Sequence, residues 1–456
     1  MTLRDKLTIR LLLLSPPDFA MGSNNDSESL IEIPQPGFRM LVSGRFCECY
    51  QENQYQPLSI KLLLAQLKEE SSFVDVEAHY GYYSLSAATR IKRGKILAIE
   101  AGGGDFELLC RNTNLNNFKQ IESLNVRISD GIEESELNIT QAPSFGGRIS
   151  HPSTQTIEQT TLPLFTLDAL LRGKRVDFIR INTAGNALNV LKGCRETLTK
   201  NPHCRLIVEF NPKRLQAAGC EPHVLLASLA DLGFEIYFCD DSRHQLARLP
   251  AGRPAAWEPY VSGKDSINLW CAPAETSLFV SMISSMSKLL DAESPLLPLA
   301  EKRIEQGAFF EIIQPEDGNS AAIVGRLPAA ERIIPKGCPL INGPGLSRTQ
   351  LMQETGRAGF ALAAELMISN PHVVLTGGSM LLSGALAAFL LDKPHCWYIE
   401  KHETGGASSV FDAAEQAAIF DAFSNHIFCQ SEQAAAIYKG FPPGKVSIAC
   451  LSARID

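Results

Sequence analysis

Short apolar runs alternate with longer amphipathic stretches between residues 71 and 273. The runs have the length of buried strands, and the stretches carry apolar residues at the spacing of helices. The pattern predicts strands at 71–76, 95–100, 176–182, 205–210, 234–240 and 268–273, the last one at a sheet edge. Predicted helices lie at 58–70, 82–91, 105–116, 187–200 and 222–233. Such alternation is typical of βαβ units with right-handed crossovers, so it predicts a mostly parallel, doubly wound α/β sheet.

The same pattern divides the chain into four segments. Residues 1–57 are rich in Ser, Asn, Pro and Gln and are predicted to be an irregular N-terminal segment. Residues 58–273 form the first α/β domain. The rhythm is lost over 274–330, which we interpret as a linker region, and it returns over 331–456 as a second, smaller Rossmann-like α/β domain.

Composition and charge exclude several classes of function. A net charge of −8 gives no reason to expect a nucleic-acid partner, which usually needs a basic face. The 12 cysteines include no CxxC pair, so we expect reduced thiols, with neither a disulfide framework nor a metal site. No window approaches the ~20 apolar residues of a membrane span, and the apolar run at 9–14 is too short for a signal peptide. These features predict a cytoplasmic protein, with peripheral membrane contact through residues 9–14 as the alternative.

The segment FVDVEAHYGYYSL (73–85) places acidic and small residues where a ligand would bind. Ligands of doubly wound sheets lie beyond the carboxyl ends of the strands, beside a helix N-terminus. Asp75 ends the first strand, Gly81 opens the following helix, and Glu100 ends the next strand. An acid at that position can bind the ribose hydroxyls of a nucleoside. Taken singly, Asp75 could equally be a helix cap and Glu100 a surface acid at a strand end.

Eight segments in this order resemble the FkbM family of methyltransferases: FVDVEAHYGYYSL, KILAIEA, LLCRNTNLNN, RISDG, TLDALL, VDFIRINTAGNALNVLKGC, LIVEFNPKRLQAAG and LGFEIY. The resemblance covers roughly residues 58–240. It implies a Rossmann-like class I methyltransferase sheet, S-adenosylmethionine as cofactor, and methylation of a hydroxyl, often on a sugar. The cofactor-binding residues it implies are Asp75, Glu77, Gly81 and Tyr82 near the methionine end, Glu100 at the ribose, and Ser129 and Asp130 near the adenine.

Two motifs depart from the family's pattern. The first loop usually reads D-x-G-A-N-x-G and here reads DVEAHYG, so Glu77 stands where a glycine would let backbone approach the ligand. The later motif, K-x-D-x-E-G-x-E, here reads RINTAGNA, so Asn182, Ala184 and Ala187 replace three acids.

These departures bear directly on catalysis. Asn182 can orient a hydroxyl nucleophile but cannot remove its proton. We therefore take Asn182 and His79 as candidate catalytic residues, with His151 and Glu209 as alternative bases. Two interpretations stay open: a divergent, working methyltransferase, or a catalytically degenerate scaffold in a glycan pathway.

The segment from residue 372 to the C-terminus resembles the N-terminal half of a GT-B glycosyltransferase of the family 4 type, in HVVLTGGSMLLSGALAAFLLDKPHCWYIEKHE and HIFCQSEQAAAIYKGFPPGKVSIACLSARID. The family's second, nucleotide-sugar-binding domain does not follow in this sequence, so the resemblance implies a partner chain supplying it, an acceptor-binding module, or a truncated gene. Polar residues near the strand ends are His372, His395, Glu400, His402 and Glu403. His402 and Glu403 could line an acceptor pocket or lie in a solvated loop. The expected partners are a small-molecule or glycan acceptor, with no nucleic acid.

Overall fold

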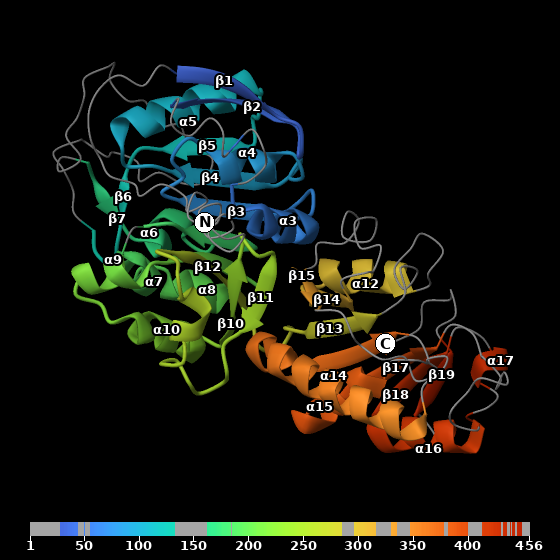
Figure 1. The fold of residues 1–456 in the computed structure, drawn as a ribbon. Helices are drawn as coiled ribbons and strands as arrows, with labels where there is room; N and C mark the ends of the chain where they lie inside the picture. The colour runs from blue at the N-terminus through green and yellow to red at the C-terminus, as the bar shows by residue number, and fades with distance from the viewer. Residues whose placement is uncertain are drawn as a thin grey trace, which may run out of the picture.

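The structure is a computed structural model. It describes residues 28–43, 50, 55–132, 162–183, 185–284, 296–315, 330–334, 347–377, 382–399, 413–429, 432–435, 438, 440–442 and 445–448. Two large sheets organise these residues, and Figure 1 shows them side by side, the first in blue to green and the second in yellow to red. No helix in the described part of the chain combines the length and the apolar character needed to cross a bilayer.

The first sheet has eight strands. They are β3 Ser72–Val76, β4 Lys95–Ile99, β5 Ile121–Leu124, β8 Phe178–Ile181, β9 Arg205–Phe210, β10 Phe234–Asp240, β11 Gln245–Arg248 and β12 Ile267–Pro273. Their spatial order is β11-β10-β12-β9-β8-β3-β4-β5, with β12 antiparallel to both of its neighbours. The chain runs outward from β3 to β5 and then returns to the other side of β3, so a switch point lies between β3 and β8. This order confirms the predicted Rossmann-like methyltransferase sheet.

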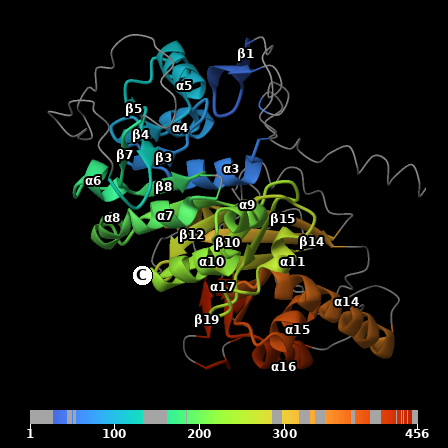
Figure 2. The same ribbon diagram turned by 90° about the vertical axis from the view of Figure 1, so that its left-hand side faces the viewer.

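Helices cover both faces of the first sheet. They are α3 Pro57–Gln66, α4 Tyr82–Ala88, α5 Gly103–Leu115, α6 Leu167–Leu171, α7 Ala187–Lys192, α8 Arg195–Lys200, α9 Pro212–Ala217, α10 Pro222–Asp231 and α11 Glu258–Val261. Figure 2 shows α7, α8 and α10 on the side away from α3 and α4. A short parallel pair, β6 Arg127–Ile128 and β7 Leu164–Phe165, extends beyond β5.

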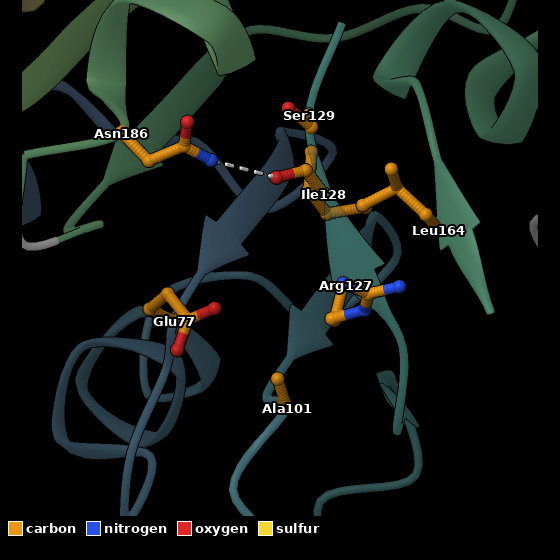
Figure 3. A pocket seen from close by; sticks show the side chains of 7 residues that line it. All are labelled: Glu77, Ala101, Arg127, Ile128, Ser129, Leu164 and Asn186. Carbon is orange, nitrogen blue, oxygen red and sulfur yellow. Dashed lines mark hydrogen bonds between the residues drawn. The ribbon is translucent and has the colours of Figure 1, made fainter. Parts of the chain in front are cut away.

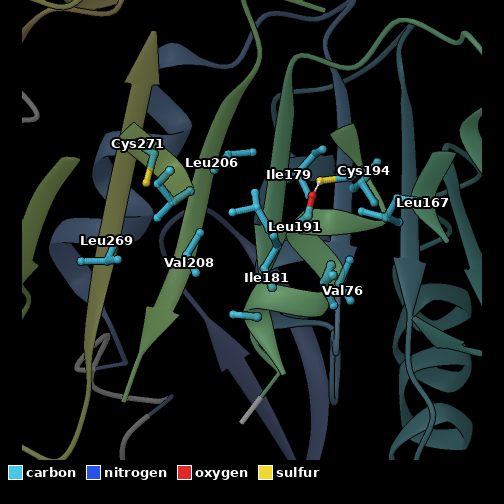
Figure 4. Packing of buried hydrophobic residues seen from close by; sticks show 14 of the residues in the cluster. Val76, Leu167, Ile179, Ile181, Leu191, Cys194, Leu206, Val208, Leu269 and Cys271 are labelled. Atoms are coloured by element: carbon cyan, nitrogen blue, oxygen red, sulfur yellow. Dashed lines mark hydrogen bonds between the residues drawn. The ribbon is translucent and has the colours of Figure 1, made fainter. Parts of the chain in front are cut away.

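Both faces of the central strands are mostly apolar, as burial under two helix layers requires, apart from the buried Asp75 and Arg180. Successive residues of β8 and β9 belong to opposite layers, because side chains alternate across a strand. Ile179, Ile181 and Val208 pack toward α7 and α8, as Figure 4 shows, whereas Phe178 and Ile207 pack on the opposite face.

The strand at 268–273 differs in position from its prediction. It is β12, inserted between β9 and β10, and β11 forms the edge instead. The apolar run of β12 fits its place inside the sheet, because the strand is buried on both faces. The true edge strand, β11, has only four residues and was not predicted from the sequence.

The single helix predicted at 187–200 is two helices, α7 and α8. Gly193 and Cys194 separate them. A Cβ atom at position 193 would lie 2.2 Å from the carbonyl oxygen of Ser129, so only glycine lets the two segments pack this closely. The break therefore follows from a tertiary contact.

Part of the predicted irregular N-terminal segment is an antiparallel hairpin, β1 Glu28–Ile33 and β2 Phe38–Ser43. Two asparagines on α5 bind its second strand through side-chain amides. Asn112 accepts from Leu41 N at 2.6 Å and donates to Leu41 O at 3.0 Å, and Asn116 makes the equivalent pair with Arg39. The hairpin is thus fixed to the first domain.

The second sheet has seven parallel strands: β13 Phe279–Ser284, β14 Phe309–Pro315, β15 Ala330–Ile334, β16 Val373–Gly377, β17 His395–Ile399, β18 His426–Cys429 and β19 Val446–Ile448. Their order is β15-β14-β13-β16-β17-β18-β19, again doubly wound. The helices described beside it are α12 Leu296–Glu305, α14 Arg348–Ser369, α15 Leu382–Leu390, α16 Ala413–Phe423 and α17 Glu432–Ala435.

The structure differs here from the linker expected at 274–330. That segment contains β13, α12 and β14, and β13 is the centre of the second sheet. The second unit therefore begins near residue 279. The strands of this segment escaped prediction because polar residues interrupt their apolar runs, FVSMIS in β13 and FFEIIQP in β14. These residues, Ser281 and Glu311, are buried, and Ser281 Oγ donates to Glu311 Oε1 at 2.6 Å.

The two units pack directly against each other. Phe279 and Phe309, at the start of β13 and β14, join the hydrophobic cluster of the first domain beside Tyr237 and Trp270. A polar network lies nearby: Arg248 Nη1 is 2.9 Å from Glu235 Oε1 and 2.8 Å from His372 Nε2. His372 therefore serves the interface between the units.

Candidate cofactor site

A cavity of about 310 Å³ opens at the carboxyl ends of the first-sheet strands β3 and β4. Figure 3 shows the side chains around it. We call it the cofactor cavity, and its lining residues are Glu77, Ala101, Arg127, Ile128, Ser129, Leu164 and Asn186. It lies where ligands bind in doubly wound sheets.

Three residues of the turn after β3 have a left-handed backbone, and two of them are not glycine. Glu77 has φ 59° and His79 has φ 50°, while Gly81 has φ 90°. A left-handed non-glycine residue costs roughly 1–2 kcal/mol. Gly81 is required at its position, because a Cβ there would also lie 2.7 Å from Leu109 Cδ1. The Glu77 side chain faces the cofactor cavity (Figure 3).

Asp75 lies fully inside the domain. Its Oδ1 is 2.9 Å from Arg180 Nη1, and its Oδ2 accepts a hydrogen bond from Ser84 Oγ at 2.8 Å. The Arg180 guanidinium also lies over the Tyr83 ring, 4.1 Å from its centroid. Burial opposes the charge on Arg180, but the Asp75 carboxylate together with Tyr55 and Tyr83 outweighs it, and the pKa of the guanidinium is raised. Asp75 thus forms a buried ion pair behind the loop and is not among the cavity-lining residues.

Glu100 stands immediately after β4, where the sequence predicted it. Its Oε2 accepts from His79 N at 2.8 Å and its Oε1 from Gly102 N at 2.7 Å. The side chain is almost fully buried, and this burial raises the pKa of Glu100 above its usual value. The carboxylate therefore joins the turn after β3 to the start of α5.

The remaining predicted residues separate into two groups. Ser129 lines the cofactor cavity and donates to Asp130 Oδ1 at 3.2 Å, so these two lie together at its rim. Tyr82 lies elsewhere, buried against the rings of Phe38, Tyr50 and Tyr55.

The predicted catalytic residues do not meet one another across the cavity. Asn182 is half-buried just after β8, and its backbone N–H donates to Val76 O at 3.2 Å. His79 Nδ1 lies 3.1 Å from Asp105 Oδ2. Neither lines the cofactor cavity. Glu209 is half-buried on β9, beside Asn268 of β12. Ala184, His151, Glu400, His402 and Glu403 lie outside the described residues.

Two polar cavity residues were not singled out from the sequence. Asn186 follows the strand predicted at 176–182, and that position is the signal that could have identified it. Arg127 lies in β6, a strand that the sequence pattern did not predict. Asn186 Nδ2 donates to Ile128 O at 3.2 Å, which connects the start of α7 to β6 (Figure 3).

Glu77 gives the cofactor cavity an unusual charge. Burial, followed by the neighbouring Glu100, raises the pKa of Glu77 to about 7. Arg127, which is positively charged, lines the same cavity. The cavity can therefore meet both a cationic and an anionic group of a ligand.

The strand order and the cavity position define the first unit as a class I methyltransferase-type domain. A family model described as the methyltransferase FkbM domain matches residues 75–236, from Asp75 in β3 to Ile236 in β10. The match covers less than half of the chain. A search of the curated proteins finds no match.

Among solved structures, the chain is similar to a precorrin-6y C5,15-methyltransferase from Geobacter metallireducens, with 11% identity and TM-score 0.26 over 49% of this chain and 87% of that one. An S-adenosylmethionine-dependent methyltransferase from Aquifex aeolicus gives 15% identity and TM-score 0.27 over 49% and 92%. A UDP-GlcNAc 2-epimerase from Methanocaldococcus jannaschii gives 16% identity and TM-score 0.28 over 37% and 44%.

Proposed function

We propose that this protein is an S-adenosylmethionine-dependent methyltransferase acting on a hydroxyl of a sugar or glycan-type acceptor. One observation carries the proposal: the cofactor cavity is lined by Glu77 and by Ala101, the residue after Glu100, at the strand ends of a domain matched by a methyltransferase family model.

The residues present fit a nucleoside cofactor. Two of the roughly four acceptor positions of the Glu100 carboxylate are taken by the N–H groups of His79 and Gly102, which leaves acceptors for ribose hydroxyls. The cavity volume of about 310 Å³ is at the lower end of the range for small-molecule sites. Glu77 would pair with the amino group of the methionine end, and Ser129 would lie near the adenine.

When bound, the cofactor would supply an electrophilic methyl group. The chain's own part would be to hold the acceptor hydroxyl beside it, because positioning alone removes much of the entropic barrier. Asn182 would orient that hydroxyl. His79 Nδ1 is paired with Asp105, so Nε2 is the ring nitrogen that would take the proton of the hydroxyl.

The test is a calorimetric titration of the full chain with S-adenosylhomocysteine, alongside a thermal melt. A ligand at 100 times its Kd adds about 2.7 kcal/mol of stability. We expect binding by the wild type, weaker binding by Glu100→Gln, and unchanged binding by Glu107→Gln, an exposed acid on α5. Absence of both heat and a melting shift would remove the proposal.

The second candidate is a binding protein that retains the sheet without chemistry. It is favoured by the replacement of three acids of the later motif by Asn182, Ala184 and Ala187. Binding of S-adenosylhomocysteine without transfer of a labelled methyl group to sugar acceptors would support it.

For the second unit, we propose a role in holding a glycan acceptor, or in pairing with a chain that carries a nucleotide-sugar domain. Its doubly wound parallel sheet supports this idea. Chromatography of the full chain with a candidate transferase half would test the pairing through co-elution.

A further inference from the structure

Three metal-ligating side chains from separate segments converge at the edge of the first sheet. His79 belongs to the turn after β3, Glu100 follows β4, and Asp105 lies in the first turn of α5. Their donor atoms all lie within 4.8 Å of one another. We propose that His79, Glu100 and Asp105 bind a divalent transition-metal ion, with Zn²⁺ or Mn²⁺ as the first candidates.

The distances suit a common ion. Nδ1 of His79 is 3.1 Å from Asp105 Oδ2 and 3.9 Å from Glu100 Oε2. Tetrahedral ligands at about 2.0–2.1 Å from Zn²⁺ stand about 3.3 Å apart. The donor atoms of Glu100 and Asp105 lie within 4.8 Å of each other, so the partly exposed His79 and Asp105 side chains would move toward Glu100 to enclose an ion.

Glu100 is already oriented for this role. The N–H groups of His79 and Gly102 each bind one of its carboxylate oxygens. Hydrogen bonds of this kind around a ligating carboxylate fix its direction and support metal affinity. Each oxygen keeps a second lone pair, so the bonds to backbone leave room for an ion.

The donor set selects the class of ion. One imidazole with two carboxylates favours Zn²⁺, Mn²⁺ or Fe²⁺ over Ca²⁺, which takes six to eight oxygens. The two acids neutralise a divalent charge. His79 and Asp105 remain partly exposed, with side-chain exposures of 44% and 38%, so an ion can reach them from solvent.

Sequence patterns alone do not predict this site. The three residues follow no metal motif, and 26 positions separate His79 from Asp105. His79 stands at the asparagine of the family's D-x-G-A-N-x-G loop, so a residue that departs from that pattern supplies the nitrogen ligand.

The inference does not rest on the proposed function, but the two share Glu100. An ion bound to Glu100 Oε2 removes an acceptor that the ribose would use. Metal and nucleoside should therefore weaken each other's binding.

The test is a titration of the reduced, chelator-treated full chain with ZnCl₂ and, separately, with MnCl₂. Mn²⁺ is the parallel probe because thiolates favour Zn²⁺ over it, so cysteines contribute little to its signal. We expect one ion per chain for Mn²⁺. His79→Ala and Asp105→Asn should lower the affinity by more than about tenfold, since even outer partners of metal ligands have effects of that size.

The matched controls are His223→Ala and Glu107→Gln, which alter an exposed histidine and an exposed acid elsewhere. They should bind both ions as the wild type does. Absence of Mn²⁺ binding, or equal binding by His79→Ala and the wild type, would overturn the inference. A thermal melt without metal checks that each variant folds.

Separate titrations distinguish this inference from the proposed function. S-adenosylhomocysteine binding with chelator present, together with no ion binding, would reject the metal site alone. Ion binding without S-adenosylhomocysteine binding would reject the methyltransferase proposal alone. If both bind, saturating nucleoside should raise the apparent Kd for Mn²⁺, and independence of the two would contradict the shared use of Glu100.

Discussion

At the residue scale, the ion pair between Asp75 and Arg180 connects β3 to β8 at the switch point of the first sheet. Both side chains are almost fully buried. A buried pair has a large cost when one partner is lost, because the other charge is then left in a medium of low dielectric constant. Because the Asp75–Arg180 pair lies behind the turn after β3, it helps to determine the geometry of that turn.

We expect Arg180→Ala to lower the free energy of unfolding by about 3–5 kcal/mol, because Asp75 would stay buried without its partner. Urea denaturation would measure the change. Arg93→Ala is the matched control: Arg93 pairs with Glu69 and Glu70 on the solvent-exposed surface, so its loss should change the free energy of unfolding far less than Arg180→Ala does. Equal effects of the two variants would contradict a special role for the buried pair.

Glu77→Gly tests the strain in the turn after β3. Glycine removes the cost of φ 59°, about 1–2 kcal/mol, but adds about 0.5–1 kcal/mol of backbone entropy. The net gain in stability should thus lie between about 0 and 1.5 kcal/mol by thermal denaturation. Affinity for S-adenosylhomocysteine should fall if the Glu77 carboxylate pairs with the amino group of the methionine end, and a rise would show that Glu77 obstructs the cofactor cavity instead.

Asp241 makes stability depend on pH. Burial raises the pKa of Asp241 from 3.8 to about 6, against hydrogen bonds from Ser59 and Asn268 that lower it. The folded state then binds more protons than the unfolded state between pH 4 and 6, so this carboxyl makes the protein less stable as pH rises through that window.

Asp241→Asn should therefore flatten the dependence of stability on pH between 4 and 6. Denaturant melts of both proteins at several pH values would measure the difference. A constant difference across the window would mean that the pKa of Asp241 is not raised in the folded protein.

At the element scale, the β1–β2 hairpin depends on side chains of α5. The side-chain amide of Asn112 binds both the N–H and the carbonyl oxygen of Leu41, and it also donates to Tyr80 O at 2.9 Å. Asn112→Ala should cost about 1–3 kcal/mol for each buried group left without a partner. Hydrogen exchange should increase across residues 28–43. Asn116→Ala, at the exposed end of the same ladder, should have a smaller effect.

The sequence predicted elements well where pattern and packing agree. Strands β3, β4, β8, β9 and β10 each appear within a residue or two of the apolar runs, and Glu100 stands at the strand end where it was expected. What failed depends on tertiary contacts. Gly193 breaks a continuous helical pattern because of the Ser129 carbonyl, and Glu311 obscures β14 because its partner lies on another strand.

The site was predicted only in part, for the same reason. Asp75 and Arg180 lie 105 positions apart, and no feature of the sequence around either residue indicates that they pair. Arg127 and Asn186 reach the cofactor cavity through the packing of β6 against α7, which spacing alone does not reveal.

At the scale of the whole molecule, aromatic side chains join the two units. Phe309 of the second sheet has its ring centroid 4.6 Å from that of Tyr237 and 5.7 Å from that of Trp270. Arg205 Nη2 adds a polar contact to Gln306 O at 3.1 Å. Such a contact couples the stability of the two sheets.

Phe309→Ala should lower the free energy of unfolding by about 3–5 kcal/mol, as expected for a fully buried phenylalanine. Because the pocket it leaves borders β10 and β12, hydrogen exchange should rise in those strands as well as in β14. Phe360→Ala, on an exposed face of α14, is the control and should change neither. A rise confined to β14 would mean that the sheets unfold independently.

The shared aromatic contact limits how the chain can be divided for experiments. An expression fragment ending at residue 273 would leave Tyr237 and Trp270 without the two phenylalanines that cover them. Such a fragment would expose apolar side chains that are buried in the full chain, and it would therefore tend to aggregate. Work on either half is therefore best done on the intact polypeptide, with point substitutions used in place of truncation.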